Sequence, residues 1–198
     1  MAFESFRLMA DGGPGTGFDA LLGLGMGTQK GGSVLDAMGV ERWIVVSPRK
    51  SWDDVGSLIL NPTDEEVAAF KRLPARSAFV GPQGTLDGAV DGCLVLRDTG
   101  KRICMPLSPD TGAAGFVFET DDMWLYDQAR AAGKYRFEFG GEGDTVGFDI
   151  DAPPIAFKHE PPQPGSPRQI LFAGIRPYYF FEILYDRREN AVGFKARD

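Results

Sequence analysis

The stretch Met105-Pro-Leu-Ser-Pro-Asp110-Thr-Gly-Ala-Ala-Gly-Phe-Val-Phe118 contains two apolar runs that meet at a tight Asp-Thr-Gly turn. Val and Phe residues such as those in the second run favour a pleated, buried strand. Gly112 and Gly115 have no Cβ, so the backbone can turn sharply there and approach a ligand closely. We therefore expect the carboxylate of Asp110 to be held at the end of buried strands, and we take this turn as the candidate site of chemistry.

The composition of the chain is typical of one globular domain made of many short strands. A length of 198 residues is enough for one domain with a substantial core. The 26 Gly and 14 Pro residues interrupt the chain too often for a helical bundle. The 28 acidic and 21 basic residues give a formal net charge of -7, and no basic run follows a phosphate backbone. We therefore expect no nucleic-acid partner.

The sequence contains no segment of the kind that inserts into a membrane. It has no run of eighteen apolar residues, and residues 3–9 lack the long apolar core of a signal peptide. We expect no membrane partner and leave the compartment open, because a secretion signal would lie upstream if the chain is a fragment of a longer precursor. A nucleotide site is not expected, because Gly23-x-Gly25 lacks the third glycine and Lys30 precedes Gly31 rather than Ser or Thr.

The tripeptide Asp-Thr-Gly occurs a second time, at Asp98-Thr99-Gly100. This copy lies between Leu94-Val-Leu96 and Ile103-Cys-Met105, a pattern that indicates a hairpin whose turn uses Asp and Gly for ordinary turn geometry. Asp110 is instead followed by an apolar run and by a predicted helix over residues 121–132. We therefore predict that Asp110, and not Asp98, lies in a cleft.

The remaining patterns predict strands and short helices. Thr63-Asp-Glu-Glu66 has the form of a capping box, and Val67, Phe70 and Leu73 follow it at helical spacing. Ser33 is the expected cap of a short helix that ends at Met38. We expect strands over residues 43–47, 56–60, 77–80, 89–97 and 102–107, a hairpin over residues 135–150, and its continuation over residues 153–157.

The C-terminal stretch Ile170-Leu-Phe-Ala-Gly174-Ile-Arg-Pro-Tyr-Tyr-Phe-Phe-Glu-Ile-Leu-Tyr-Asp186-Arg-Arg-Glu-Asn190-Ala-Val-Gly-Phe194 resembles the closing motif of pepsin-like aspartic proteases. In that family an apolar-apolar-Gly segment crosses behind the catalytic loop, a short helical turn follows, and a Phe-rich strand runs into Asp-Arg-x-x-Asn-x-Val-Gly-Phe. Residues 18–25 are similar to the segment that closes the N-terminal lobe of these proteases. The resemblance covers residues 18–198.

The resemblance implies a mainly β fold: an acid-protease (pepsin-like) β-barrel lobe with a few short helices. Residues 1–32 would be a remnant of the N-terminal lobe and the interlobe segment, and residues 33–198 would be the C-terminal lobe. Asp110 would be catalytic, and four residues would support its loop: Thr111, Gly112, Ala113 and Gly174.

Two positions depart from the pepsin-like pattern. Ala113 stands where pepsins usually place Ser or Thr, although retropepsins carry Ala there, so a hydroxyl that could bond the catalytic carboxylate is missing. Phe172-Ala173 precedes Gly174 where the family packs two branched apolar residues.

The implied activity is that of an aspartic endopeptidase acting on a peptide or protein substrate. Its chemistry uses two carboxylates that share one proton, because the ionised member activates a water and the protonated member polarises the scissile carbonyl. Asp110 alone cannot do both, so its partner would come from a missing N-terminal lobe or from a second copy in a homodimer. The alternative is a catalytically incomplete lobe that acts as a peptide- or protein-binding module.

Other kinds of site have little support in the sequence. His159 is the only histidine and lies in a polar, Pro-rich stretch, so we expect it on the surface or in a loop rather than in a Ser-His-Asp arrangement. One His and two Cys match no zinc pattern, so we expect no metal and no cofactor. Cys93 and Cys104 either form a disulfide or are two reduced, buried thiols. The aromatic run over residues 178–181 is interpreted as core and lobe interface.

Overall fold

The computed structural model describes residue 26 and residues 34–48, 56–81, 84–111, 113–141, 143–162 and 168–197. These residues form many strands and a few short helices, so the predicted mainly β class is confirmed. In chain order the elements are α1 (Val34–Ala37), β1 (Arg42–Val46), β2 (Ser57–Leu60), α2 (Asp64–Val67), β3 (Lys71–Gly81), β4 (Gly84–Leu96), β5 (Lys101–Ser108), β6 (Phe116–Thr120), α3 (Met123–Ala132), β7 (Lys134–Phe139), β8 (Val146–Asp151), η1 (Pro154–Ala156), β9 (Phe157–Glu160), β10 (Gln169–Phe172), α4 (Pro177–Phe180), β11 (Phe181–Asp186) and β12 (Ala191–Ala196).

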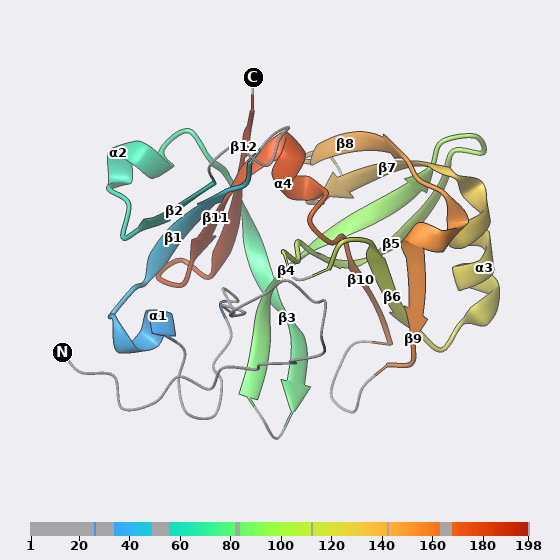
Figure 1. Cartoon of the computed structure of the whole chain (residues 1–198), viewed down its shortest axis with the longest axis horizontal. Helices are drawn as coiled ribbons and strands as arrows, with labels where there is room; N and C mark the ends of the chain where they lie inside the picture. The colour runs from blue at the N-terminus through green and yellow to red at the C-terminus, as the bar shows by residue number, and fades with distance from the viewer. Residues whose placement is uncertain are drawn as a thin grey trace, which may run out of the picture.

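The strands of the described ranges belong to one connected sheet. Their order is β2-β1-β11-β12-β3-β4-β5-β10-β6-β9, and the hairpin of β7 and β8 is attached to β4. Strand β3 links the two parts of the sheet, because residues 71–74 pair with β12 and residues 75–81 pair with β4. Figure 1 shows β1, β2, β11 and β12 on the left and the part that contains β5 to β10 on the right.

Strand β10 lies between β5 and β6, the two strands that flank the Asp110 turn. It runs parallel to β5, with Leu171 opposite Leu107, and antiparallel to β6, with Leu171 opposite Phe118. Strands β5 and β6 follow each other along the chain, yet a strand from near the C-terminus separates them. The apolar segment before Gly174 therefore passes directly beside the Asp110 turn, as the resemblance implied.

The capping box predicted at Thr63 is present, but the helix that it starts is shorter than predicted. The Thr63 hydroxyl accepts a hydrogen bond from the Glu66 N–H at 3.3 Å, and the Glu66 carboxylate accepts one from the Thr63 N–H at 2.7 Å. Helix α2 ends at Val67, and Leu73 already lies in β3. The helical spacing was misleading at Leu73 because this side chain is buried from a strand that pairs with β12.

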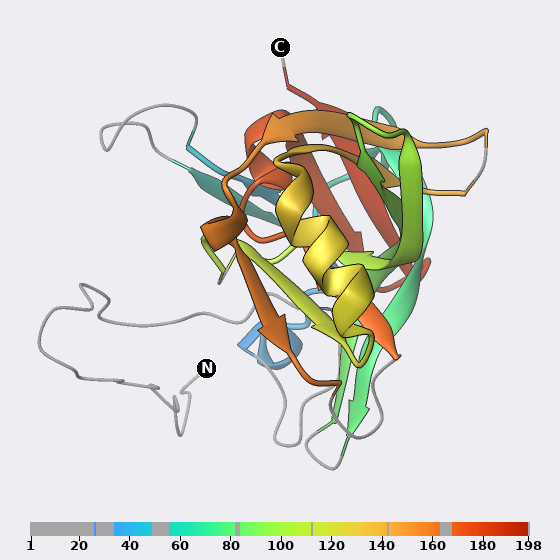
Figure 2. The ribbon, with the colours of Figure 1, turned by 90° about the vertical axis from the view of Figure 1, so that its right-hand side faces the viewer.

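Helix α3 confirms the helix predicted over residues 121–132 and lies across the outside of the part that contains β6 and β9 (Figure 2). The Asp122 carboxylate caps its first turn by accepting a hydrogen bond from the Leu125 N–H at 2.9 Å. Gly133 ends the helix with a φ of 75°. The Tyr135 hydroxyl then accepts from the Gly133 N–H at 2.9 Å and donates to the Arg130 carbonyl at 3.2 Å.

Aromatic side chains fill much of the interior. Phe116 stacks on Phe137 with ring centroids 5.0 Å apart, and Phe137 stacks on Phe148 at 5.1 Å. Such a pair contributes about 0.5–1.5 kcal/mol beyond the area that it buries. The largest aromatic side chains that are fully buried are Trp43, Tyr135, Tyr178, Phe116, Phe118, Phe137 and Phe139. This core explains how a chain with so many turns holds its strands together.

The prediction that the hairpin continues through residues 153–157 is wrong. Pro154–Ala156 form the 3-10 helix η1, and β9 begins only at Phe157. Strand β9 pairs in parallel with β6, not with β8. Proline favours this outcome because it has no N–H to donate to a sheet and its φ suits the start of a helical turn.

The two cysteines form a disulfide, which decides between the two alternatives left open by the sequence. Cys93 and Cys104 are directly opposite each other on the antiparallel strands β4 and β5. The disulfide therefore links the strand that leads to the Asp110 turn with its neighbour in the sheet.

The proposed lobe boundary lies outside the described residues. Of residues 1–33, which include the expected cap Ser33, only Met26 is described, and the short helix predicted to follow Ser33 is present as α1. Among the helices of the described ranges, none is long and apolar enough to cross a membrane.

Candidate active site

Asp110 lies just beyond the end of β5, in the turn that leads to β6. It is half-buried, and the Pro109 before it is buried. Asp98 is exposed in the turn between β4 and β5, where it forms an ion pair with Lys134 at 3.4 Å. The interpretation of Asp98 as an ordinary hairpin residue is confirmed, whereas the placement of Asp110 in a cleft stays a prediction.

Three backbone hydrogen bonds tie the Asp110 turn to the segment that follows β10. In each, an N–H donates to a carbonyl oxygen: Ala173 to Ser108 at 2.8 Å, Asp110 to Gly174 at 3.1 Å, and Ile175 to Ala113 at 2.9 Å. A further bond from the Ala113 N–H to the Asp110 carbonyl, at 3.4 Å, closes the turn itself. The backbone before and after Asp110 is therefore held by residues 173–175, a segment that is distant from the turn in the sequence.

Gly174 must be glycine for two independent reasons. Its φ is 59°, in the left-handed region that residues with a Cβ rarely adopt. A Cβ built on it would also lie 2.7 Å from the Ala113 carbonyl oxygen and closer still to that of Gly115. Gly115 is confined in the same way, because its Cβ would lie 2.6 Å from the Ala156 carbonyl oxygen. Gly174 thus lets the segment after β10 approach the Asp110 turn this closely, whereas Gly115 lets the residues before β6 approach η1.

The structure brings together three of the five residues predicted for the site. Asp110, Ala113 and Gly174 are joined by the backbone hydrogen bonds given above. Thr111 is exposed, and Gly112 lies outside the described residues. Ala113 takes part in these hydrogen bonds through its backbone N–H and carbonyl, and its side chain has no hydroxyl that could bond Asp110.

Two tyrosines next to the turn were not connected with it by the sequence analysis. The hydroxyls of Tyr178, on α4, and Tyr185, on β11, are 2.6 Å apart, and the Tyr185 hydroxyl also donates to the Pro109 carbonyl at 3.4 Å. Burial raises the pKa of both hydroxyls well above the usual value, and the nearby negative charge of Asp110 raises each pKa further. The sequence offered only the aromatic run over residues 178–181 as a signal for Tyr178. Nothing in the sequence indicated that its hydroxyl would meet that of Tyr185.

His159 was predicted on the surface or in a loop, and it lies instead on a strand with its side chain partly exposed. It is half-buried on β9, with its ring Nε2 2.8 Å from the Thr120 carbonyl oxygen and its ring 5.1 Å from that of Tyr126. The pairing of β9 with β6, which the sequence did not indicate, places it there. Within the ranges that the structure describes, no group of three His, Cys, Asp or Glu residues is arranged to hold a metal ion.

A polar pocket of about 460 Å³ opens on another part of the surface. Its lining residues are Glu41, Arg42, Asn61, Pro62, Thr63, Asp64 and Arg188. The Arg42 guanidinium bonds the Asp64 carboxylate at 2.7 Å and lowers the pKa of that carboxyl. None of the lining residues belongs to the Asp110 turn, and the two arginines are balanced by two carboxylates, so the pocket adds nothing to the candidate active site.

The comparisons with known proteins bear on the fold. The sequence matches no protein-family profile and no curated protein sequence. The structure is similar to the crystal structure of basic 7S globulin from soybean, with a TM-score of 0.58 and 10% sequence identity, over 89% of this chain and 58% of that chain. The chain thus spans little more than half the length of this neighbour. Because basic 7S globulin has a pepsin-like fold, this chain has a mainly β, distantly pepsin-like fold with a few short helices.

Proposed function

We propose that this chain is an aspartic endopeptidase lobe that hydrolyses peptide bonds through a water activated by Asp110. The second carboxylate of the reaction comes from a partner lobe or from Asp110 of a second copy. Thr111, Gly112, Ala113 and Gly174 hold the loop that carries Asp110. The substrate is a peptide or protein, and the reaction uses no metal and no cofactor.

One observation carries this proposal: the Asp110 turn is held by backbone hydrogen bonds to residues 173–175, which we call the Gly174 segment. This segment directly follows β10, the strand that lies between β5 and β6. Rigid backbone on both sides of a carboxylate suits a group that must meet a substrate in one orientation. The distantly pepsin-like fold supports the same assignment, since the turn and the crossing segment were expected from that resemblance. The exposed Asp98 turn is tied to the rest of the described chain by one such backbone bond, from the Arg97 N–H to the Lys134 carbonyl at 3.0 Å, and its other backbone hydrogen bonds go to Leu96 within the hairpin.

The chemistry needs two carboxylates at close range. Two such groups cannot both be ionised, so they hold one shared proton. The ionised member takes a proton from water as the water oxygen attacks the scissile carbonyl carbon, and the protonated member gives its proton to the carbonyl oxygen. The tetrahedral intermediate then collapses: one of its two hydroxyls returns a proton to the second carboxylate, the C–N bond breaks, and the leaving nitrogen receives a proton from the first carboxyl, which restores the shared-proton pair.

A second copy is the partner that this chain can itself supply. Asp98 is on a hairpin turn, paired with Lys134, and so is not a second carboxylate for Asp110. Two copies related by a two-fold axis would place equivalent Asp110 turns opposite each other, because such an interface uses the same surface on both subunits. Activity should therefore rise with protein concentration through the range in which the copies associate.

The test compares Asp110→Asn with Asp98→Asn. Both variants make the same chemical change, and the second removes only an exposed ion pair, which contributes little to stability. Wild type and variants are incubated with an unfolded protein substrate between about pH 3 and 7, the range over which carboxylates titrate. We expect cleavage at acid pH by wild type and Asp98→Asn, and none by Asp110→Asn. Inhibitors of serine, cysteine and metalloproteases should have no effect.

Cleavage by Asp110→Asn at the wild-type rate would discard the aspartic mechanism. No cleavage by wild type at any concentration, together with peptide binding that Asp110→Asn leaves nearly unchanged, would favour the binding module instead. Sedimentation at the assay concentrations shows whether two copies were present, so a monomer that cleaves would reject the homodimer.

A further inference from the structure

The peptide unit between Pro109 and Asp110 is held at both of its ends. Its N–H, that of Asp110, donates to the Gly174 carbonyl at 3.1 Å. Its carbonyl, that of Pro109, accepts a hydrogen bond from the Tyr185 hydroxyl at 3.4 Å. A peptide unit is planar and rigid, so fixing both ends fixes the position of the Asp110 Cα.

The hydroxyl of Tyr185 is itself oriented by Tyr178. A tyrosine hydroxyl has one proton to donate and can accept at its oxygen. When Tyr185 donates to Pro109, the 2.6 Å contact between the two hydroxyls requires Tyr178 to donate to Tyr185. The bonds then run in one direction, from Tyr178 through Tyr185 to the carbonyl of Pro109.

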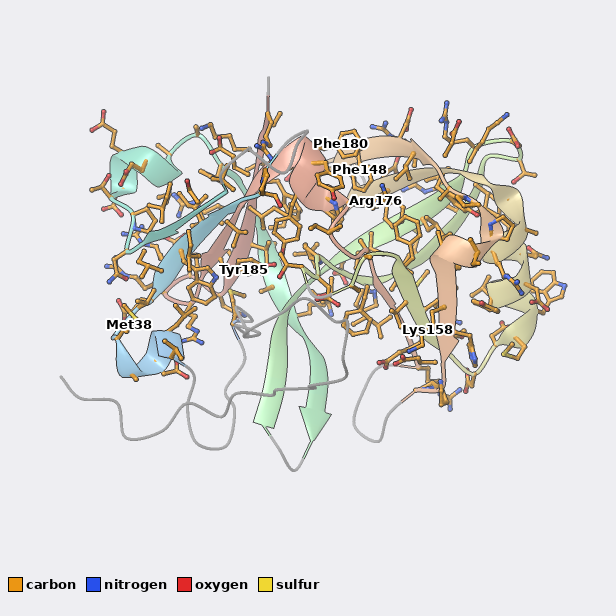
Figure 3. All side chains as sticks on the ribbon, in the orientation of Figure 1. Met38, Phe148, Lys158, Arg176, Phe180 and Tyr185 are labelled. Carbon is orange, nitrogen blue, oxygen red and sulfur yellow. A yellow bond between two sulfur atoms is a disulfide. The ribbon has the colours of Figure 1, made fainter. Side chains whose placement is uncertain are left out.

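The ring of Tyr185 has little freedom to move. Trp43 stacks on one side of it, with ring centroids 5.6 Å apart and planes 21° from parallel. Gly88 lies against its edge, where a Cβ would be 3.3 Å from the Tyr185 Cε1. Figure 3 shows Tyr185 near the middle of the molecule, and 4% of its surface is exposed. Packing thus holds the hydroxyl where it reaches the Pro109 carbonyl.

The two hydroxyls stay neutral wherever carboxylates titrate. Burial raises the pKa of Tyr178 and of Tyr185, so both keep their protons throughout the acid and neutral range. The two hydroxyls therefore remain hydrogen-bond donors over the whole acid range in which the proposed reaction is tested.

We propose that Tyr178 and Tyr185 are positioning residues for Asp110, which they hold through the chain of hydroxyls that ends at the Pro109 carbonyl. The role in catalysis rests on the proposed function, but the anchoring of the Asp110 peptide does not. Ser108 Oγ, 3.5 Å from the same carbonyl oxygen, is the one other side-chain donor recorded there in the described part of the chain, and it is at the limit of hydrogen-bond distance.

The test replaces each hydroxyl by hydrogen and follows the amide of Asp110 by NMR hydrogen exchange. Tyr185→Phe removes the donor to Pro109, so we expect the Asp110 N–H to exchange about two- to tenfold faster than in wild type, relative to the amides of β3 that pair with β12. Tyr178→Phe leaves Tyr185 free to donate to Pro109 and should have a smaller effect. The NMR chemical shift of the Asp110 amide should also change in Tyr185→Phe, since the peptide unit moves relative to its surroundings.

Tyr135→Phe is the matched control. It removes the hydroxyl of another buried tyrosine, which bonds the end of α3, away from the Asp110 turn. A loss of stability alone would speed exchange at Asp110 and in β3 together, in both variants. The proposal is overturned if Tyr185→Phe, like Tyr135→Phe, leaves the relative exchange and the chemical shift of the Asp110 amide unchanged.

A second readout separates this proposal from the proposed function. If the wild type cleaves substrate, Tyr185→Phe should lower kcat with little change in KM, because it displaces a reacting group rather than a binding contact. If the wild type cleaves nothing, the exchange measurement still decides whether the tyrosines anchor Asp110.

Discussion

At the scale of single residues, Gly174 and Gly100 show how two glycines with the same backbone conformation serve different purposes. Their φ angles are 59° and 69°. A Cβ at Gly100 would meet nothing within 4 Å, whereas one at Gly174 would overlap the carbonyl oxygens of Ala113 and Gly115. We expect Gly100→Ala to lower the free energy of unfolding by about 1–2 kcal/mol, the cost of a left-handed alanine. Gly174→Ala should lower it by about 2–5 kcal/mol because the overlap adds to that cost.

Urea denaturation of the two variants measures this difference. Gly100→Ala is the control, since it carries the backbone strain without the overlap. Equal losses in the two variants would mean that the Asp110 turn moves aside at no cost, and would contradict the rigid contact between the turn and the Gly174 segment.

At the scale of elements, helix α3 depends on the residue that caps its start. Asp121 and Asp122 are neighbours of the same type, but only Asp122 accepts the hydrogen bond from the Leu125 N–H. We expect Asp122→Ala to lower the free energy of unfolding by about 1 kcal/mol, because it leaves a donor of the first turn without its partner. Asp121→Ala should stay within about 0.5 kcal/mol of wild type, as exposed substitutions usually do. Thermal denaturation followed by circular dichroism tests both, and similar losses for the two would reject the capping role.

At the scale of the whole molecule, buried tyrosines make the fold sensitive to alkali. Burial raises the pKa of Tyr135, Tyr178 and Tyr185 above the value that they have in the unfolded chain. Their contribution to stability is therefore complete below about pH 10, the usual tyrosine pKa, and is lost as pH rises through the higher folded values.

We expect the tyrosinate absorbance to rise together with the loss of near-ultraviolet circular dichroism between about pH 9 and 13. Ionisation and unfolding coincide because these hydroxyls cannot lose a proton while they are buried. Ionisation of all five tyrosines while the tertiary signal stays intact would contradict the burial of the hydroxyl pair.

The sequence by itself determined the features whose cause lies within a few residues. The hairpin turn at Asp98, the helix that starts near Asp122 and the capping box at Thr63 were all predicted, because each depends on residues close together in the chain. Most of the strands followed from their apolar patterns, and the resemblance to pepsin-like proteases implied the mainly β class. The position of Gly174 beside the Asp110 turn was also expected, although only from that resemblance.

Only the tertiary structure decided the features whose partners are distant in the chain. Leu73 proved to be in a strand, because pairing with β12 outweighs a weak helical spacing. The disulfide between Cys93 and Cys104 depends on the register of β4 and β5, and the bond from Tyr185 to Pro109 depends on β10 entering between β5 and β6. Composition and periodicity specify which side chains are buried and not which of them meet, so the supports of Asp110 became visible only in the fold.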